Sequence, residues 1–490
     1  METACFKNLK SRPAPDTPPV VALCQGTGIG AVRRFVICCA LIVSLVIALV
    51  FACPVYSQQI PSEAKPDNGK ATVKDADNLS VASKLINDYF KAKGLDERGK
   101  ILDALEKTGF MPSVKELSRI IKETAVYPSM EPLKRTTRKI MVSGKEYSYE
   151  LSLPKGYTPK KEEPLIIALH GSGGNGLNAL HIWRISEEDQ DAEKEKMIDL
   201  IKRQGQKPPP KGSMRVRSTL ETGQYIIAAP TLENAPGKGV SADLMEHLLP
   251  VLLEDVASVC NIDTNRVVIT GFSMGGHFTW AETLHQPDCF AGAVPMMGAC
   301  DDMGALSNLR SVPVYAIHGD KDNIVPVEFS RNATAALTAL KFDVTYREIK
   351  GLGHTLFPWD SPECAKLLEW IGSRTRDPYP KKISYRFSGQ SAAVKKIYWL
   401  EVVQGQKNAF TVEAEVVDNV VNIKSTGVTK ATLLLNSELV DFAKDVIVRV
   451  NGRKVFNGRA DPSYKFLLEN FQEYSDPKSL FTAGITLDMR

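Results

Sequence analysis

Short apolar runs separated by helical patterns constrain the fold of this chain more than any other feature of its sequence. The runs occupy residues 165–169, 225–229, 266–270, 292–296, 312–317 and 344–349, and apolar residues recur at helical spacing over 242–259, 275–285, 330–341 and 362–371. A strand that is apolar on both sides needs cover on both faces, as in a parallel sheet flanked by helices. The sequence therefore predicts an α/β domain with a mostly parallel sheet.

The limits of this domain follow from the segments around the runs. Strands are expected over 138–143 and 147–153, on either side of a Gly144-Lys145 turn, so we place the domain at residues 131–377. A long insertion at 177–222 interrupts the alternation of strands and helices, and it contains a run of charged residues at 187–196 and three prolines at 208–210. An insertion of this length is typical either of a functional cap or of a solvated excursion, and the sequence leaves both open.

The first 57 residues are typical of a secretory signal peptide. The apolar run 35–53 follows Arg33 and Arg34, and Val55 and Ser57 fit the −3 and −1 positions of a cleavage site after Ser57. The run is also long enough for an uncleaved membrane anchor, and Cys53 offers a third, lipoprotein reading. We therefore expect export to the periplasm or the cell exterior, with residues 58–80 as a linker behind the signal or anchor.

Two further modules are expected on either side of the α/β domain. Residues 81–130 have apolar positions at helical spacing, which predicts two or three short helices that pack on that domain. Residues 381–490 form a β-rich accessory module, with strands expected over 382–387, 396–403, 409–417, 420–424, 431–435, 446–450 and 454–456 and a short helix over 464–471. Asn451-Gly452 indicates a type I′ hairpin. Tyr398 and Trp399 fall on one predicted strand, where they either join the core or stack on a sugar.

Cysteine usage and charge exclude several classes of protein. Five of the nine cysteines lie in or before the signal segment, and the other four are Cys260, Cys289, Cys300 and Cys364. Four cysteines allow zero, one or two disulfides, and four free thiols are an equal alternative. Their spacing fits no structural zinc site. The net charge of +4 without a basic cluster speaks against a nucleic-acid binder, and a single long apolar run excludes a polytopic membrane protein.

The segment 271–275, Gly-Phe-Ser-Met-Gly, has the G-x-S-x-G pattern of a nucleophile elbow. It directly follows the apolar run 266–270 and opens a helical pattern, which is the context that the elbow requires. The flanking glycines permit the sharp turn that lifts the Ser273 hydroxyl above the edge of the sheet, and the helix N-terminus favours developing negative charge. We take Ser273 as the candidate nucleophile.

A serine hydroxyl needs a base and an acid that orients the base. With the chain order Ser, Asp/Glu, His, only His354 lies downstream of a suitable acid, and it follows the run 344–349 directly. Asp320 and Asp322 both follow the run 312–317. We favour Asp322, because it lies further into the loop, whereas Asp320 is better placed to bond its own turn.

The oxyanion of a tetrahedral intermediate needs two backbone N–H donors. Met274, the residue after the nucleophile, supplies one. The glycine-rich loop after residue 169, His-Gly-Ser-Gly-Gly-Asn-Gly, supplies the other from Ser172 or Gly173. The loop lacks the Lys-Ser/Thr ending of a phosphate-binding P-loop, and His170 is expected to have a structural role.

The motifs HGSGGNG, GFSMGG, HGDKDNIVP and GLGH, in this order, resemble the α/β-hydrolase superfamily. The resemblance covers roughly residues 135–375. It is strongest to the exported branch that groups phospholipase/carboxylesterase-like and polyhydroxybutyrate-depolymerase/feruloyl-esterase-like enzymes with prolyl-oligopeptidase-type catalytic domains. It implies an α/β-hydrolase fold with Ser273 as nucleophile, Asp322 as acid, His354 as base, and Met274 with Ser172 or Gly173 at the oxyanion hole. The insertion 177–222 departs from the compact members.

The leading hypothesis is an exported serine hydrolase that cleaves a small-molecule or polymer-borne carboxylic ester without a metal or organic cofactor. A peptidase acting on small peptides is the alternative. Ester is favoured because the short segment before the domain cannot form the propeller of a prolyl oligopeptidase. A third hypothesis is a non-catalytic scaffold whose C-terminal module binds a polysaccharide or a protein.

Overall fold

The computed structural model describes residues 73–203, 207, 223–232, 242–357, 361–388, 396–406 and 409–490. The predicted signal or anchor, most of the linker and the three prolines at 208–210 lie outside these residues. Within them, no helix is both long and apolar enough to cross a membrane.

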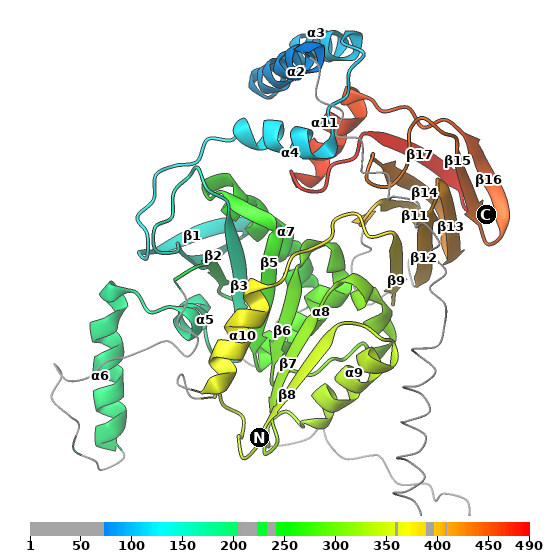
Figure 1. Cartoon of the computed structure of the whole chain (residues 1–490). Helices are drawn as coiled ribbons and strands as arrows, with labels where there is room; N and C mark the ends of the chain where they lie inside the picture. The colour runs from blue at the N-terminus through cyan, green and yellow to red at the C-terminus, as the bar shows by residue number, and fades with distance from the viewer. Residues whose placement is uncertain are drawn as a thin grey trace, which may run out of the picture. The chain divides into compact units, whose positions relative to one another are not determined.

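An eight-stranded sheet forms the centre of the α/β domain (Figure 1). Its strands are β1 (Arg135–Val142), β2 (Lys145–Ser152), β3 (Glu163–Leu169), β4 (Ile226–Pro230), β5 (Ile262–Phe272), β6 (Gly292–Met296), β7 (Val314–Gly319) and β8 (Val344–Ile349), in the spatial order β1-β2-β4-β3-β5-β6-β7-β8. β1 and β2 pair antiparallel, as do β2 and β4, and the others are parallel. The predicted sheet is therefore confirmed.

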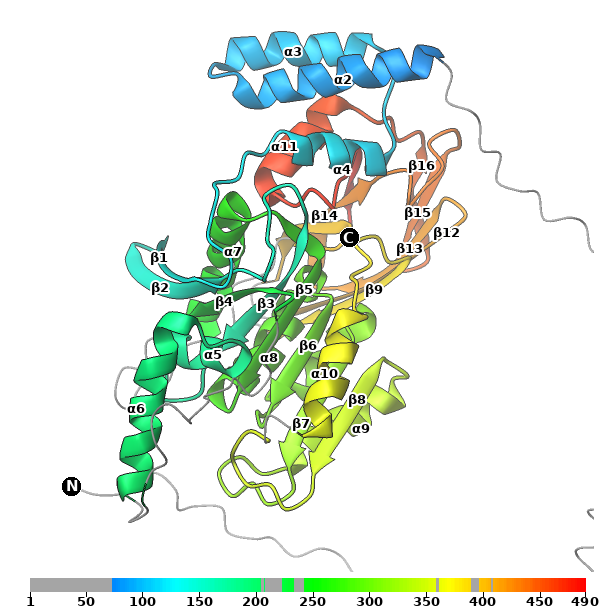
Figure 2. The same ribbon diagram turned by 60° about the vertical axis from the view of Figure 1, so that its left-hand side comes forward.

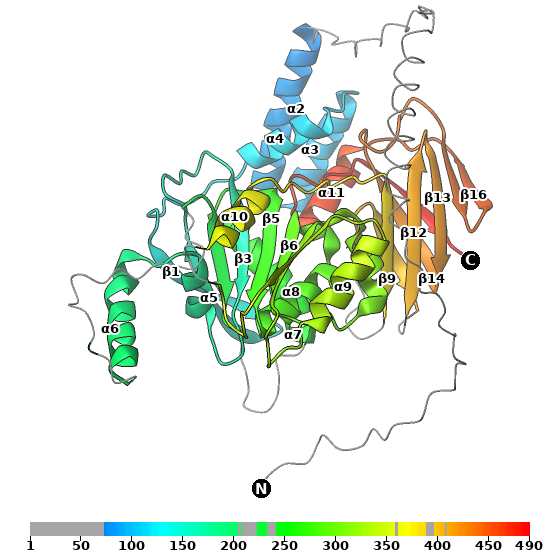
Figure 3. The ribbon, with the colours of Figure 1, turned by 60° about the horizontal axis from the view of Figure 1, so that its bottom comes forward.

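Helices cover both faces of this sheet (Figure 3). On one face lie α7 (Ala242–Val259), α8 (Met274–His285) and α9 (Glu328–Ala339), and on the other lie α5 (Gly176–Trp183) and α10 (Pro362–Gly372). Two short 3-10 helices, η2 (Pro287–Cys289) and η3 (Met303–Ser311), flank β6. Side chains alternate between the two layers, so that Leu165 and Ile167 pack in one core and Ile166 and Ala168 in the other.

The expected insertion at 177–222 is partly an element of the fold. Its first residues form α5, in which Leu180 and Trp183 are buried against the sheet, so the excursion begins only after this helix. The charge run forms α6 (Glu187–Arg203), which lies beside the layered body in all three views (Figures 1–3). Asp189 anchors the start of α6, because its carboxylate bonds Arg135 and the Ser186 hydroxyl.

The N-terminal helical segment differs from expectation in its start and in its partner. Its helices are α2 (Val73–Lys91), α3 (Leu95–Lys107) and α4 (Val114–Glu123), so α2 begins within the expected linker 58–80. Their apolar faces pack on α11 (Tyr464–Tyr474) of the C-terminal module (Figure 2). The Tyr464 hydroxyl donates to Phe110 O at 2.8 Å, and Glu106 accepts from the Tyr464 amide. Lys122 of α4 contacts the α/β domain, where it forms an ion pair with Glu162 and donates to Ile262 O at 3.2 Å.

The C-terminal module is a sandwich of two sheets around its own core. One sheet has the order β10-β11-β14-β17, and the other β16-β15-β13-β12-β9. The strands are β9 (Lys382–Phe387), β10 (Lys396–Ile397), β11 (Leu400–Gly405), β12 (Phe410–Val417), β13 (Val420–Thr426), β14 (Val428–Leu435), β15 (Val446–Val450), β16 (Arg453–Gly458) and β17 (Ala483–Asp488). The Asn451-Gly452 turn has positive φ at both residues, as predicted for a type I′ hairpin.

One strand predicted in the module, 396–403, is a hairpin instead. Tyr398 has a φ of 54° and forms the turn between β10 and β11 with Trp399. Both rings are buried, and the Trp399 indole donates to Pro380 O at 2.7 Å. These two aromatic residues therefore belong to the core, and the sugar-stacking role is wrong. All four cysteines of the described chain are free thiols.

Candidate active site

Ser273 lies on a strained turn between β5 and α8. Its backbone has φ 58° and ψ −117°, which is outside the regions that a serine ordinarily adopts. The neighbouring glycines make this turn possible. A Cβ at Gly271 would lie 2.4 Å from the carbonyl carbon of Gly275, and a Cβ at Gly275 would lie 2.3 Å from Leu169 O. The turn therefore has the geometry that the sequence predicts for a nucleophile elbow.

The structure brings Ser273, His354 and Asp322 together from three loops that follow β5, β8 and β7. His354 Nε2 is 2.8 Å from Ser273 Oγ, and His354 Nδ1 is 2.7 Å from Asp322 Oδ2. An ionised carboxylate only accepts, so the proton of the neutral imidazole is on Nδ1 and Nε2 is free to accept from the serine hydroxyl. Phe272 packs its ring beside the imidazole, with the ring centroids 5.0 Å apart.

Backbone and side-chain donors surround the Asp322 carboxylate. Oδ1 accepts from the amides of Ile324 and Val325, both at 2.9 Å, and Oδ2 accepts from His354. Burial raises the pKa of Asp322, but the hydrogen bonds from His354 and the two amides outweigh it and hold the pKa below its ordinary value. Asp322 is thus an anion at neutral pH.

Asp320, the alternative acid, has a different partner. Its Oδ1 accepts from the amide of Gly351 at 2.5 Å and so ties the β7 loop to the β8 loop. Asp322, and not Asp320, therefore contacts His354, as expected from the sequence. The expectation that Asp320 bonds its own turn is wrong, because it bonds the neighbouring loop.

The two predicted sources of oxyanion donors lie beside the elbow. Met274 is the first residue of α8, where a backbone N–H has no acceptor within the helix. Ser172 and Gly173 occupy the central positions of a turn that the Gly174 amide closes on Gly171 O at 3.0 Å, and Gly173 has a φ of 75°. A Cβ built on Gly171 would lie 3.6 Å from Ser273 Cβ, so this loop adjoins Ser273.

His170 has the structural role expected of it. Its Nε2 accepts from the Leu232 amide at 2.9 Å, so the ring donates from Nδ1 to Gly171 O at 2.8 Å. Burial lowers the pKa of His170, which keeps the ring neutral and able to accept. The imidazole therefore holds the glycine-rich loop against the segment that follows β4.

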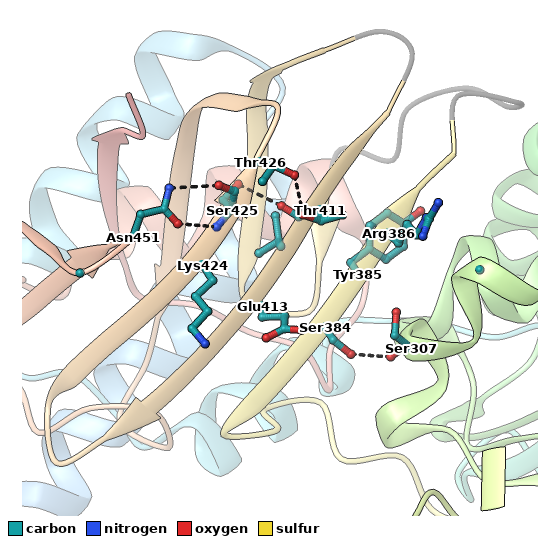
Figure 4. A pocket seen from close by; sticks show the side chains of 13 residues that line it. Ser307, Ser384, Tyr385, Arg386, Thr411, Glu413, Lys424, Ser425, Thr426 and Asn451 are labelled. Atoms are coloured by element: carbon teal, nitrogen blue, oxygen red, sulfur yellow. Dashed lines mark hydrogen bonds between the residues drawn. The ribbon is translucent and has the colours of Figure 1, made fainter. Parts of the chain in front are cut away.

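A hollow of about 680 Å³ lies elsewhere, where η3 meets the five-stranded sheet of the module (Figure 4). Ser307 and Ser384 are hydrogen-bonded across this junction, and Glu413 and Lys424 line the sheet side. None of Ser273, Asp322 and His354 lines it. In the described chain, no group of three or more histidine, cysteine or acidic side chains is arranged to hold a metal ion.

Parts of this chain are similar to known proteins. Residues 225–364 match the model of the family described as Phospholipase/Carboxylesterase. A stretch of 74 residues is 34% identical to a bifunctional acetylxylan esterase/xylanase of Neocallimastix patriciarum, over 15% of this chain and 11% of that protein. A stretch of 110 residues is 27% identical to acyl-protein thioesterase 1 of Gibberella zeae, over 21% of this chain and 47% of that protein.

The chain therefore spans less than half the length of these two curated relatives. Among solved structures, a thermostable esterase has 24% sequence identity over 49% of this chain and 63% of that chain, with a TM-score of 0.37. The strand order of the sheet and the strand–turn–helix arrangement at Ser273 are those of an α/β-hydrolase fold, and the segment 225–364 within it is similar to the phospholipase/carboxylesterase family.

Proposed function

We propose that this protein is a serine hydrolase that cleaves carboxylic esters through an acyl-enzyme on Ser273. One observation carries the proposal, namely the unbroken hydrogen-bonded line from Ser273 Oγ through both nitrogens of His354 to Asp322. A nucleophile, a base and an anion that orients the base are the parts that acyl transfer needs.

In the proposed reaction, a proton moves along the hydrogen-bonded line between Ser273 and His354. His354 Nε2 accepts the proton of Ser273 as Oγ attacks the carbonyl carbon, and Asp322 stabilises the resulting imidazolium. The amide of Met274 and an amide of the 172–173 turn stabilise the oxyanion. His354 then protonates the leaving alkoxide, and a water molecule that His354 deprotonates attacks the acyl-enzyme and releases the acid. The helix dipole of α8 favours the negative charge that develops at its N-terminus.

The non-catalytic hypothesis fits this geometry poorly, because a dead scaffold has no need of a strained serine within 2.8 Å of an oriented imidazole. An ester is favoured over a peptide because the segment 73–134 contains three helices and no strand, and so provides no propeller to select peptides. Export with cleavage after Ser57 is part of the proposal, with a small-molecule or polymer-borne ester as substrate.

The test combines labelling with a substrate panel. A fluorophosphonate probe should label the wild type at Ser273 and leave Ser273→Ala unlabelled, with the modified peptide identified by mass spectrometry. The panel consists of p-nitrophenyl acyl esters, feruloyl esters, acyl thioesters and aminoacyl amides. We expect turnover of oxygen esters to exceed turnover of the amides. A folded wild type that neither labels nor hydrolyses any ester would refute the proposal, and preference for amides would favour the peptidase alternative.

A further inference from the structure

A second histidine lies behind the acid of the proposed active site. His318 is on β7, four residues before Asp322, and its side chain is fully buried. Its Nε2 is 2.9 Å from Val325 O and 3.3 Å from Asp322 Oδ2, and its Nδ1 is 2.7 Å from the hydroxyl of Ser330 on α9. The hydrolytic mechanism described above does not use this ring.

The partners of His318 determine where its proton is. Val325 O and the Asp322 carboxylate are both acceptors, so Nε2 carries the hydrogen. Nδ1 then accepts from the Ser330 hydroxyl, which is free to donate. Burial lowers the pKa of His318, although its contacts with Val325 O and Asp322 oppose this, and the ring therefore stays neutral. A neutral ring with a fixed tautomer is a stationary N–H donor at the back of Asp322.

We infer that His318 is a positioning residue that fixes the Asp322 carboxylate and tunes its basicity for His354. The same oxygen, Oδ2, lies 2.7 Å from His354 Nδ1 and 3.3 Å from His318 Nε2, whose shorter contact is the 2.9 Å hydrogen bond to Val325 O. The bond from His318 to Val325 O also holds the loop whose amide binds Oδ1. This inference rests on the proposed function, because it concerns the orientation of the base in that reaction.

The sign of the effect on the base follows from this arrangement. A donor on Oδ2 withdraws charge from the carboxylate, which weakens its stabilisation of the His354 imidazolium. Loss of that donor leaves a more basic carboxylate, which stabilises the imidazolium of the proposed base more strongly. The acid limb of the pH–rate profile should therefore move to higher pH. A shift of the Asp322 carboxylate should also lower kcat, because a displacement of about 1 Å at a reacting group lowers the rate by up to about 100-fold.

The other charged groups that face His318 stay constant over the range of the assay. On β8, Glu348 lies opposite His318 in the sheet and binds Arg331 of α9 at 2.6 Å. The hydrogen bonds from Arg331 lower the pKa of Glu348 to about 2, so this carboxylate is ionised throughout. On the other side of β7, Met296 at the end of β6 and the following Met297 pair with Ile317, the residue before His318, and neither methionine titrates.

The experiment compares His318→Leu, which removes the donor, with His318→Gln, whose amide can place an N–H near the position of Nε2. Thr334→Val is the matched control, because it removes a buried hydroxyl on α9 that bonds Ser330 O and does not touch Asp322. Each variant is measured between about pH 5 and pH 9 by the rate of fluorophosphonate labelling and by ester hydrolysis. The downfield proton resonance of His354 Nδ1–H reports the bond to Asp322 without any turnover.

We expect His318→Leu to lower kcat by about 10- to 100-fold with little change in KM, and to move the acid limb upward by about half a pH unit. His318→Gln should have a kcat and an acid limb close to those of the wild type, and Thr334→Val should change neither. If the Leu variant does not fold, the Gln variant decides, because a smaller shift in the same direction is still expected. Equal loss at all pH values without a shift, and no change in the His354 resonance, would overturn the inference. A wild type that is not labelled at Ser273 would instead overturn the proposed function, and this inference with it.

Discussion

Replacement of Asp322 by asparagine should disable the base through its tautomer, without disturbing the fold. Oδ1 of Asp322 accepts from two backbone amides, so the oxygen of an asparagine has to occupy that place. Its NH2 group then faces His354 Nδ1 at the 2.7 Å that the carboxylate oxygen now spans. Two N–H donors cannot bond each other, so the neutral imidazole takes the tautomer with its hydrogen on Nε2.

This tautomer cannot accept the proton of Ser273, which sets the size of the effect. We expect kcat on p-nitrophenyl esters to fall by about four orders of magnitude, as is typical when the acid of a triad becomes an amide. At 1.36 kcal/mol per factor of ten, the barrier rises by about 5 kcal/mol. The thermal unfolding temperature should change little, since both backbone hydrogen bonds to the side chain remain.

Asp320→Asn is the control for this experiment. Asp320 lies two residues away and accepts one amide hydrogen from Gly351, and an asparagine oxygen can keep that bond. The control should therefore retain activity within a few-fold of the wild type. If Asp320→Asn lost as much activity as Asp322→Asn, or if Asp322→Asn stayed active, the assignment of Asp322 as the orienting acid would be wrong.

Three further predictions concern stability. Gly276→Ala should lower the free energy of unfolding by about 3 kcal/mol, because its Cβ would lie 2.6 Å from Met296 O. Gly99→Ala, in an exposed part of α3 with no atom near the new Cβ, should raise the free energy of unfolding by about 0.5–1 kcal/mol. Chemical denaturation measures both changes, and a Gly276→Ala variant as stable as the wild type would contradict the first. Asp476→Asn should destabilise by about 3 kcal/mol, since it leaves the buried guanidinium of Arg376 without its carboxylate, and a neutral result would mean that water replaces the pair. Dithiothreitol should leave the unfolding temperature unchanged because the four cysteines are free thiols, and a lower temperature would reveal a disulfide.

The α/β domain could be predicted because its elements depend on local patterns. The expected ranges 292–296, 344–349 and 242–259 coincide with β6, β8 and α7. The three candidate residues could also be located, because the carboxyl ends of parallel strands meet at one edge of a sheet. Their catalytic roles stay predictions until labelling is done.

The features that could not be predicted from the sequence depend on contacts between distant segments. The α2–α4 helices show an apolar face, but nothing local says that this face packs on α11, more than 300 residues later. The turn at Tyr398 and the last strand, β17, were missed for a related reason. A buried pair of aromatic residues fits a strand as well as a turn, and the pairing of β14 with β17 joins segments about fifty residues apart. His318 gave no signal because a histidine four residues before an acid is informative only when the loop between them is known.

The attachment of the C-terminal module bears on what this module can do. Ser273, the proposed nucleophile, lies directly before α8 at the carboxyl edge of the sheet, and the helix then runs back for 12 residues, about 18 Å, to the opposite edge. The module binds at that opposite edge, since the Tyr385 hydroxyl donates to the carbonyl of His285, the last residue of α8, and Lys396 binds Asp288 in η2 at 2.6 Å. Arg376, at the junction, also donates to Asp288 O and Asn265 at the entry of β5. The described residues of the module that make these contacts therefore lie about one helix length from Ser273, and we expect them to contribute to the stability of the sheet or to binding at a separate surface and not to contact the substrate of Ser273.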